Sequence, residues 1–262
     1  MKGQTLEIEH VDDGIVSLRL FTDENPYIEA SFISMLAKHV EDLKADATVR
    51  AIVVEGGTRY FSAGASREAL LATDPEVALL PRIGEIPRLI LSLPVPTIAA
   101  MAGHAIGGGF LIGLWCDISV LAEESLYGIN ATALGITPVM GSSVVLEEAL
   151  GAPLARELLF AGRMVKGNEI KEWGGSLAHA IVPRAMVLDH AYSIAREIAD
   201  KPRRPVSLYK LAICAKRREI LERALEVEEE MYKHVVDDKE TSSLIAEHYP
   251  VAYSQPADGN HS

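Results

Sequence analysis

Two stretches of small residues could bring bare backbone against a ligand. The first is "FSAGAS" at residues 61–66, and the second is Gly107, Gly108 and Gly109, directly before the most apolar run of the chain. The glycines do not fit a phosphate loop, because neither Gly-Lys-Ser/Thr nor G-x-G-x-x-G occurs with them. If the triple glycine opens a helix, its first N–H groups are unpaired, and together with the backbone of the first stretch they could bind one oxyanion and stabilise the enolate of a thioester.

The elements that must position these stretches form an α/β pattern. Residues 5–21 alternate around an Asp-Asp-Gly turn and predict a β-hairpin, and residues 31–46 have helical spacing. Three short apolar runs predict buried strands, at 49–57, 96–104 and 116–125. A helix between the last two predicts parallel strands joined by right-handed crossovers.

The second half of the chain predicts helices only. From about residue 140 the pattern is helical, and it ends in a long helix over about 206–236. We expect a core at residues 1–200, a C-terminal helical region at 201–250 and a disordered tail at 251–262.

The composition disfavours two classes of partner. The chain has 262 residues and a net charge of −12, which disfavours nucleic acid and anionic membranes. It contains no apolar run long enough to span a membrane, and "MKGQTLEIEH" is not a signal peptide, so we expect a cytoplasmic protein. Cys116 and Cys214 have no metal-ligand spacing, and we expect them to be reduced and buried. We expect no metal and no cofactor.

Four motifs together resemble one superfamily. In order and spacing, "FSAGAS", "AAMAGHAIGGGF", "CDISVLAEES" and "GITPVMG" are similar to the signatures of the crotonase (enoyl-CoA hydratase/isomerase) superfamily. The resemblance covers about residues 5–250. It implies a crotonase-type ββα spiral core with C-terminal helices that assemble a homotrimer or a dimer of trimers. It also implies an oxyanion hole made by the N–H groups of Ala65 and Gly108.

Two positions in the motifs depart from the hydratases of that superfamily. Those enzymes use two glutamates, and the matching residues here are Leu111 and Ala131. Neither side chain can move a proton, so hydration and double-bond isomerisation are disfavoured. With Leu79, Leu80 and Asn130, these residues are the expected walls of the substrate site, and apolar walls suit loss of CO₂ from a carboxylated thioester.

The C-terminal part supports a narrower resemblance. "PRAMVLDHAYSIAREIADKP" and "EVEEEMYKHVVDDKETSSLIAEHY" are similar to the decarboxylating homologues of polyketide β-branching (HMG-synthase) cassettes. This resemblance implies decarboxylation of a 3-methylglutaconyl-type thioester on an acyl carrier protein. Two alternatives stay open: a hydratase or isomerase acting on a CoA ester, and a catalytically inactive crotonase that serves as a scaffold.

The decarboxylating subfamily carries a lysine and a histidine that this chain lacks. No lysine occurs between residues 44 and 166, and Arg82 is nearest to the expected place. Tyr232 stands where the histidine would follow Met231, and His234 lies two places on. Both cannot face one pocket from a regular helix, and we expect Tyr232 to face the thioester.

Three further side chains lie in the motifs or directly after them. His104 could contact the substrate or fix its own turn through a backbone hydrogen bond. Ser142 and Ser143 follow a glycine, but no G-x-S-x-G elbow surrounds them, so we expect them to cap a helix.

The segment 201–223 is basic, although the whole chain is acidic. It holds eight Lys or Arg residues. We expect it to bind an acidic carrier protein or the phosphates of CoA. The candidate contacts are Arg203, Arg204, Lys216 and Arg217.

Overall fold

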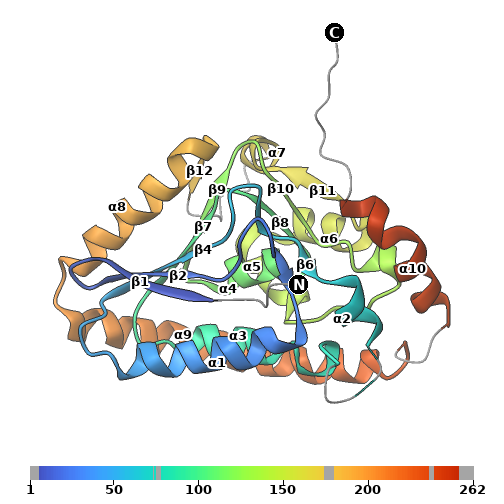
Figure 1. Ribbon diagram of the computed structural model, residues 1–262, viewed down its shortest axis with the longest axis horizontal. Helices are drawn as coiled ribbons and strands as arrows, with labels where there is room; N and C mark the ends of the chain where they lie inside the picture. Colours follow the sequence, from blue (N-terminus) through green and yellow to red (C-terminus); the bar gives the residue numbers. More distant parts are fainter. Residues whose placement is uncertain (1–5, 73, 75–77, 174–179, 236–238, 254–262) are drawn as a thin grey trace, which may run out of the picture.

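A six-stranded sheet crosses the centre of the protein. The computed structural model describes residues 6–72, 74, 78–173, 180–235 and 239–253. Helices pack on both faces of the sheet, and two smaller sheets extend it toward the C-terminal helix (Figure 1).

The large sheet has the strand order β1-β2-β4-β7-β9-β12. Its strands are β1 (Glu7–Asp12), β2 (Ile15–Arg19), β4 (Ala51–Glu55), β7 (Thr97–Met101), β9 (Ile118–Ala122) and β12 (Ala180–Val182). The β1–β2 pair is the antiparallel hairpin expected from the sequence, and the other neighbours pair in parallel. Every residue of β4 and β7 is buried, as parallel strands covered on both faces require.

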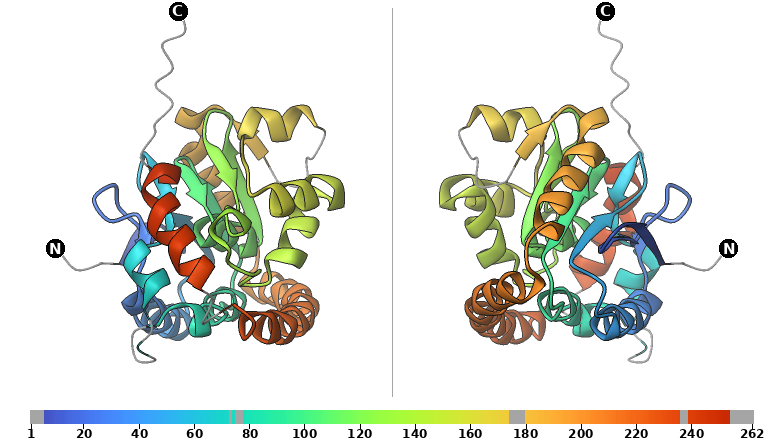
Figure 2. Two further views of the ribbon diagram at one scale, coloured as in Figure 1. Left: turned by 90° about the vertical axis from the view of Figure 1, so that its right-hand side faces the viewer. Right: turned by 90° about the vertical axis from the view of Figure 1, so that its left-hand side faces the viewer.

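Different helices cover the two faces of this sheet. Helix α8 (Val187–Ala199) packs on one face through small residues, among them Ala191 and Ala195. The opposite face carries α1 (Ala30–Ala45), α3 (Glu85–Leu91) and α4 (Gly108–Trp115), which form the main hydrophobic core with the sheet. Figure 2 shows α8 and the group containing α1 and α3 on opposite sides of the sheet.

The smaller sheets lie beside α4. One has the order β11-β10-β8-β5, and the other pairs β3 with β6 in parallel. Their strands are β3 (Tyr27–Ile28), β5 (Tyr60–Ser62), β6 (Gly64–Ala65), β8 (His104–Ile106), β10 (Leu126–Gly128) and β11 (Met164–Lys166). Strand β6 thus belongs to the "FSAGAS" motif, and β8 leads into the triple glycine.

The chain has seven further short helices before α8 within the described residues. They are α2 (Arg67–Leu71), η1 (Leu80–Arg82), η2 (Thr132–Leu134), α5 (Ser142–Leu150), α6 (Ala152–Ala161), α7 (Gly167–Glu172) and η3 (Arg184–Met186). No helix within the described ranges is both long and apolar enough to cross a membrane. Cys116 and Cys214 are free and buried, as expected.

The C-terminal region differs from the single helix predicted over 206–236. Helix α9 covers Arg203–Tyr232, and a separate helix α10 covers Lys239–Tyr253. The prediction of a disordered tail is therefore wrong for residues 251–253, which belong to α10, and residues 254–262 lie outside the described residues. The prediction of helices only after residue 140 is also wrong, because β11 and β12 lie there.

Candidate active site

A cavity of about 470 Å³ opens beside the first turn of α4. Most of its wall is apolar. Residues from β6, η1, α4, the segment after β10, α5, α6 and α9 line it: Ala65, Leu80, Ile83, Gly108, Leu111, Asn130, Ala131, Ser142, Ser143, Phe160 and Met231 are among them. The two small-residue stretches singled out in the sequence therefore meet at one cavity.

Close contact between β6 and the start of α4 depends on glycine. Gly64 has φ +81°, and a Cβ built on it would lie 2.8 Å from the Ile106 carbonyl oxygen and 3.7 Å from the Gly108 nitrogen. Gly107 precedes α4 with φ 54°, and Gly108 is the first helical residue. A side chain at Gly64 would hold β6 away from the helix, so this residue type is required here.

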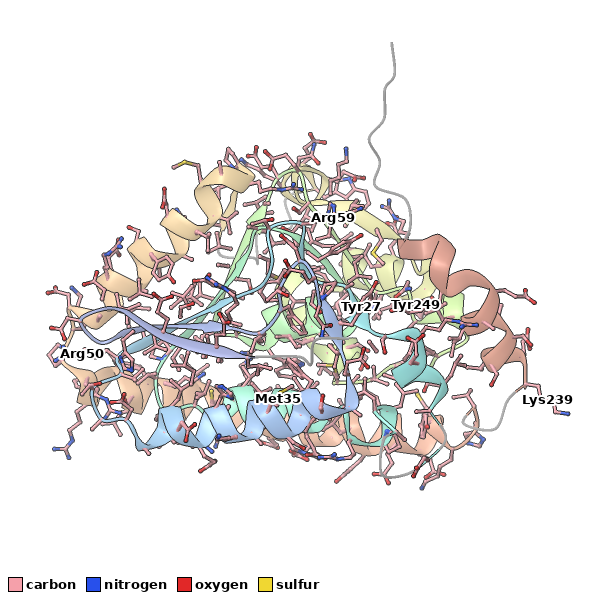
Figure 3. The ribbon with its side chains drawn as sticks, in the orientation of Figure 1. Tyr27, Met35, Arg50, Arg59, Lys239 and Tyr249 are labelled. Carbon is pink, nitrogen blue, oxygen red and sulfur yellow. The ribbon has the colours of Figure 1, made fainter. Side chains whose placement is uncertain are left out.

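The backbone of Ala65 faces away from its partner strand. In the parallel β3–β6 pair, the N–H of Ser66 donates to the Ile28 carbonyl at 3.3 Å, so the adjacent Ala65 presents its polar groups to the other side. Its carbonyl accepts the hydroxyl of Tyr249 in α10, a residue that packs near Tyr27 (Figure 3). Helix α10, which the sequence did not reveal as separate, thus fixes the strand that carries Ala65.

The start of α4 is the second stretch of bare backbone at the cavity, opposite β6. The Gly107 carbonyl accepts the N–H groups of Phe110 and Leu111, at 3.1 and 3.2 Å. The N–H of Gly108 lies earlier, in the first turn, where helical amides have no intrahelical acceptor and the dipole is positive. An anionic oxygen between β6 and α4 would meet this end of the helix.

The structure brings only some of the predicted substrate-wall residues to the cavity. Leu80, Leu111, Asn130 and Ala131 all line the cavity. Leu79 does not line it: the side chain is 1% exposed and belongs to the hydrophobic core.

Arg82 also lies outside the cavity wall. Its guanidinium group pairs with Glu85 of α3, with Nε 2.9 Å from Oε1. Its assignment as a substrate contact is corrected, because Glu85 holds the side chain at the partly exposed surface. Within the described part of the wall, Arg156 is the one cation and Glu147 the one carboxylate, and they pair with each other at 2.9 Å.

His104 fixes a turn and does not line the cavity. Its Nδ1 accepts the backbone N–H of Leu126 at 2.9 Å, which ties β8 to β10. Burial, with the charges of Arg184 and Arg59, lowers the pKa of its imidazole. Of the two roles considered for His104, the structure supports the backbone hydrogen bond.

Met231, rather than Tyr232, reaches the cavity from the end of α9. Tyr232 is half-buried and is not part of the cavity wall. His234 is exposed beyond the last turn of α9 and lines a separate surface groove with Val227 and Met231. The expectation that Tyr232 faces the thioester is therefore wrong for the cavity of a single chain, because the helix presents the preceding side chain.

The start of α5 is capped from another helix. Gly141, not a serine, is the N-cap residue, and no side chain of Ser142 or Ser143 caps it. Instead Oε2 of Glu228 in α9 accepts the Gly141 N–H at 2.9 Å. Burial raises the pKa of Glu228 to about 7. The sequence analysis missed this residue, although it follows Leu221 and Ala224 at the spacing of a buried helix face.

The basic segment does not form one exposed patch. Arg217 is buried, and it donates to the carbonyls of Leu114, Trp115 and Cys116 at the end of α4. Its assignment as a carrier-protein contact is wrong, since its cation stabilises the negative end of a helix.

The other three predicted carrier contacts stay at the surface, far from the cavity. Arg204 and Lys216 are exposed, and Arg203 donates to the Val49 carbonyl. Arg203 precedes Met231 by 28 residues of one helix, so about 42 Å separate them. The structure therefore does not bring Arg203 and Arg204 to this chain's own cavity, and their contact with a carrier protein stays a prediction.

Fold and site together define an enzyme class. A small-residue strand opposite a glycine-opened helix, which itself packs on a largely parallel sheet, is the arrangement expected of a thioester-binding crotonase. The model of the enoyl-CoA hydratase/isomerase family matches residues 13–255, and the chain belongs to this family. The expected family and fold class are thereby confirmed.

Three individual proteins that are similar to this chain are a decarboxylase, a dehydratase/decarboxylase couple and a hydratase. The chain is 30% identical to bacillaene synthase decarboxylase PksI of Bacillus subtilis, over 94% of this chain and 98% of that protein. A solved structure of a dehydratase/decarboxylase enzyme couple involved in polyketide β-branching is 29% identical, with a TM-score of 0.83 over 93% of this chain and 98% of the other. Human mitochondrial methylglutaconyl-CoA hydratase is 35% identical, over 81% of this chain and 64% of the hydratase.

Proposed function

We propose that this chain is a lyase that decarboxylates a 3-methylglutaconyl-type thioester carried by an acyl carrier protein, in polyketide β-branching. The observation that carries the proposal is the cavity wall. Bare backbone of β6 and α4 borders the cavity, while Leu111 and Ala131 replace the two glutamates that the family's hydratases use. The similarity to a decarboxylase over nearly the whole chain supports the same reaction.

The first step requires a place for the electron pair released with CO₂. The bond between the substrate carboxylate and its neighbouring carbon breaks, and the pair delocalises onto the thioester oxygen as a dienolate. The N–H groups of Ala65 and Gly108 would hold that oxygen. Such preorganised donors are worth about 3 kcal/mol each, because they gain strength as the negative charge develops.

The apolar wall would favour the same step. A localised carboxylate is poorly solvated beside Leu80, Ile83 and Leu111, whereas the transition state spreads its charge toward the oxyanion donors. A glutamate at Leu111 or Ala131 would repel the substrate carboxylate. The absence of carboxylates at these two positions is therefore a requirement of decarboxylation as well as an obstacle to hydration.

The carrier protein would approach the side of the cavity formed by α6. Phe160 lines the cavity and is 80% exposed, so the cavity reaches the surface there. Arg156 and Glu147 form an exposed ion pair at the same rim. A thioester arm entering past Phe160 would place its carbonyl at the buried end, near Gly108.

A homo-oligomer, a trimer or a dimer of trimers, is the second part of the proposal. One face of α9 carries exposed apolar side chains at spacings of 4, 7, 7 and 4 residues, which align on a helix. They are Tyr209, Ile213, Ile220, Val227 and Met231, and we name them the α9 stripe. Met231 also lines the cavity, so a subunit covering the stripe would lie next to the substrate.

One assay tests the proposed reaction against its alternatives. The protein is incubated with a 3-methylglutaconyl thioester on an acyl carrier protein and with the corresponding CoA ester, and both are followed by mass spectrometry. Loss of CO₂ supports the proposal. Addition of water, or isomerisation without loss of mass, would identify a hydratase or isomerase, and no change with either substrate would favour an inactive scaffold.

A further inference from the structure

Helix α10 contacts the strand that carries one of the two proposed oxyanion donors. Tyr249 of α10 is 6% exposed, and its hydroxyl donates to the carbonyl oxygen of Ala65. Its ring lies in a small apolar cluster with Ile245 and with Tyr27 of β3 (Figure 3). A buried tyrosine hydroxyl thus ends on the backbone of a residue that lines the cavity.

Strand β6 leaves both polar groups of Ala65 outside its ladder with β3. The β3–β6 sheet has two strands in the described part of the chain, and the N–H of Ser66 donates to the Ile28 carbonyl across it. Neighbouring residues of a strand direct their N–H and C=O groups to opposite edges, so those of Ala65 lie at the edge away from β3. Tyr249 binds the carbonyl at that edge. The N–H of Ala65 lies at the same edge, beside the cavity.

Two hydrogen bonds therefore hold the peptide unit between Ala65 and Ser66. Its N–H is bound by the Ile28 carbonyl, and its C=O is bound by the Tyr249 hydroxyl. A peptide unit is planar, so bonds at both of its polar groups fix its plane. The unit before it carries the Ala65 N–H and adjoins Gly64 at φ +81°, and glycine restrains the backbone least of all residues. The orientation of the Ala65 N–H consequently depends on the anchored unit that follows it.

Other contacts dock α10 independently of the Tyr249 hydroxyl. Thr241 donates from its Oγ1 to the Gly135 carbonyl at 3.0 Å. Ile245 is 2% exposed and shares the apolar cluster with Leu134 of η2. The helix should therefore stay in place when Tyr249 loses its hydroxyl, and the loss should act on β6 alone.

We propose that Tyr249 is a positioning residue for the oxyanion hole: its hydroxyl holds the Ala65 carbonyl so that the Ala65 N–H points at the thioester oxygen. This inference rests on the proposed function. An oxyanion donor stabilises the transition state only when it is aimed at the atom where the charge develops, and small misplacements are costly. Tyr249 acts through β6, since the described cavity wall does not include it.

The variant Tyr249→Phe tests the proposal, with Thr241→Val as the matched control. Each substitution removes one hydroxyl that α10 donates to a backbone carbonyl, but only the first carbonyl belongs to Ala65. Steady-state decarboxylation of the carrier-bound thioester gives kcat and KM, and thermal unfolding followed by circular dichroism reports the fold. For Tyr249→Phe we expect kcat to fall about tenfold at an unchanged KM, because the donor acts on charge that develops in the transition state. Thr241→Val should keep the wild-type kcat.

A spectroscopic measurement does not depend on turnover. The probe is 3-methylbutanoyl pantetheine with ¹³C at the thioester carbonyl, which has no carboxylate to lose. Hydrogen bonds to a carbonyl oxygen lower its stretching frequency, so infrared difference spectra of the bound probe report the oxyanion hole directly. We expect the wild type and Thr241→Val to lower the frequency equally, and Tyr249→Phe to lose part of that shift.

Three results would overturn the proposal. The first is a wild-type kcat and carbonyl frequency in Tyr249→Phe. The second is an equal loss in both variants, which would assign the effect to the docking of α10. The third is a wild type that leaves the carbonyl frequency of the probe as it is in water. A wild type that shifts the frequency but releases no CO₂ fails the proposed function alone, since the spectra of the two variants still decide the role of Tyr249.

Discussion

The guanidinium group of Arg217 stacks on the indole of Trp115, with its central carbon 5.0 Å from the ring centroid. The same group donates to three carbonyls at the end of α4 and to Glu148 of α5. Residue Arg217 of α9 therefore binds the C-terminus of α4, while the N-terminus of α4 opens onto the cavity.

Replacing Arg217 should destabilise the fold. Arg217→Ala removes charge-assisted hydrogen bonds from buried carbonyls, and we expect a loss of about 3 kcal/mol in the free energy of unfolding. Arg217→Lys keeps the charge without the planar fork and should lose about half as much. Urea denaturation followed by circular dichroism measures both variants. Equal stability of the alanine variant and the wild type would show that these bonds contribute nothing net.

Gly64→Ala should damage the proposed oxyanion site more than the fold. Its Cβ would press on the Ile106 carbonyl oxygen and approach Gly108, so we expect the decarboxylation rate to fall about 100-fold, as for loss of one donor. Gly14→Ala is the matched control: Gly14 has φ +73° against +81° for Gly64, but it lies in the β1–β2 turn. Both should lose about 1–3 kcal/mol of stability. A similar fall in rate for Gly14→Ala would attribute the effect to instability.

The parts that the sequence predicted well are those with a local signal. The β1–β2 hairpin, β4, β7 and β9 follow from alternation and apolar runs bounded by turn residues, and the helix start at the triple glycine follows from the bare backbone before an apolar run. Strands β11 and β12 have three residues each, too few to show a period. Glu228 was missed because a glutamate in a charged helix suggests a solvated face, and only the packing of α5 on α9 shows that it is buried. The burial of Arg217 was missed for the same reason, because an arginine in a charged helix also suggests a solvated face.

A carboxylate restored to the cavity should oppose decarboxylation. Ala131→Glu would place a negative charge in the wall, and we expect at least a tenfold lower rate at pH 8, because the substrate carboxylate would be repelled. Ala131→Gln has nearly the same size without the charge and should retain most of the rate. Steady-state kinetics at pH 8 on one thioester compare the pair. Equal rates for the two variants would contradict the argument that the neutral wall serves the reaction.

The α9 stripe predicts an assembled protein. Ile213 and Ile220 are 54% and 40% exposed on the stripe, and replacing both by glutamate would place charges in an apolar interface. We expect the double variant to sediment as a monomer at micromolar concentration, where the wild type is a trimer or larger. Leu188→Glu on α8, with a wild-type exposure of 40%, is the control and should leave the assembly intact. A wild type that is already monomeric would overturn this prediction.

The end of α9 allows a direct test of which side chain contacts the substrate. Met231 lines the cavity, whereas Tyr232 lies about 100° further round the helix, outside the cavity wall. Met231→Ala should therefore raise KM about tenfold through lost apolar contact, and Tyr232→Phe should change kcat by less than about threefold. His234→Ala should match Tyr232→Phe, because His234 is exposed beyond the helix. A 10–100-fold fall in kcat for Tyr232→Phe alone would mean that the phenol acts as an acid. In that event the residue would have to serve a neighbouring subunit's cavity, and the monomeric Ile213/Ile220 variant should lose the same factor.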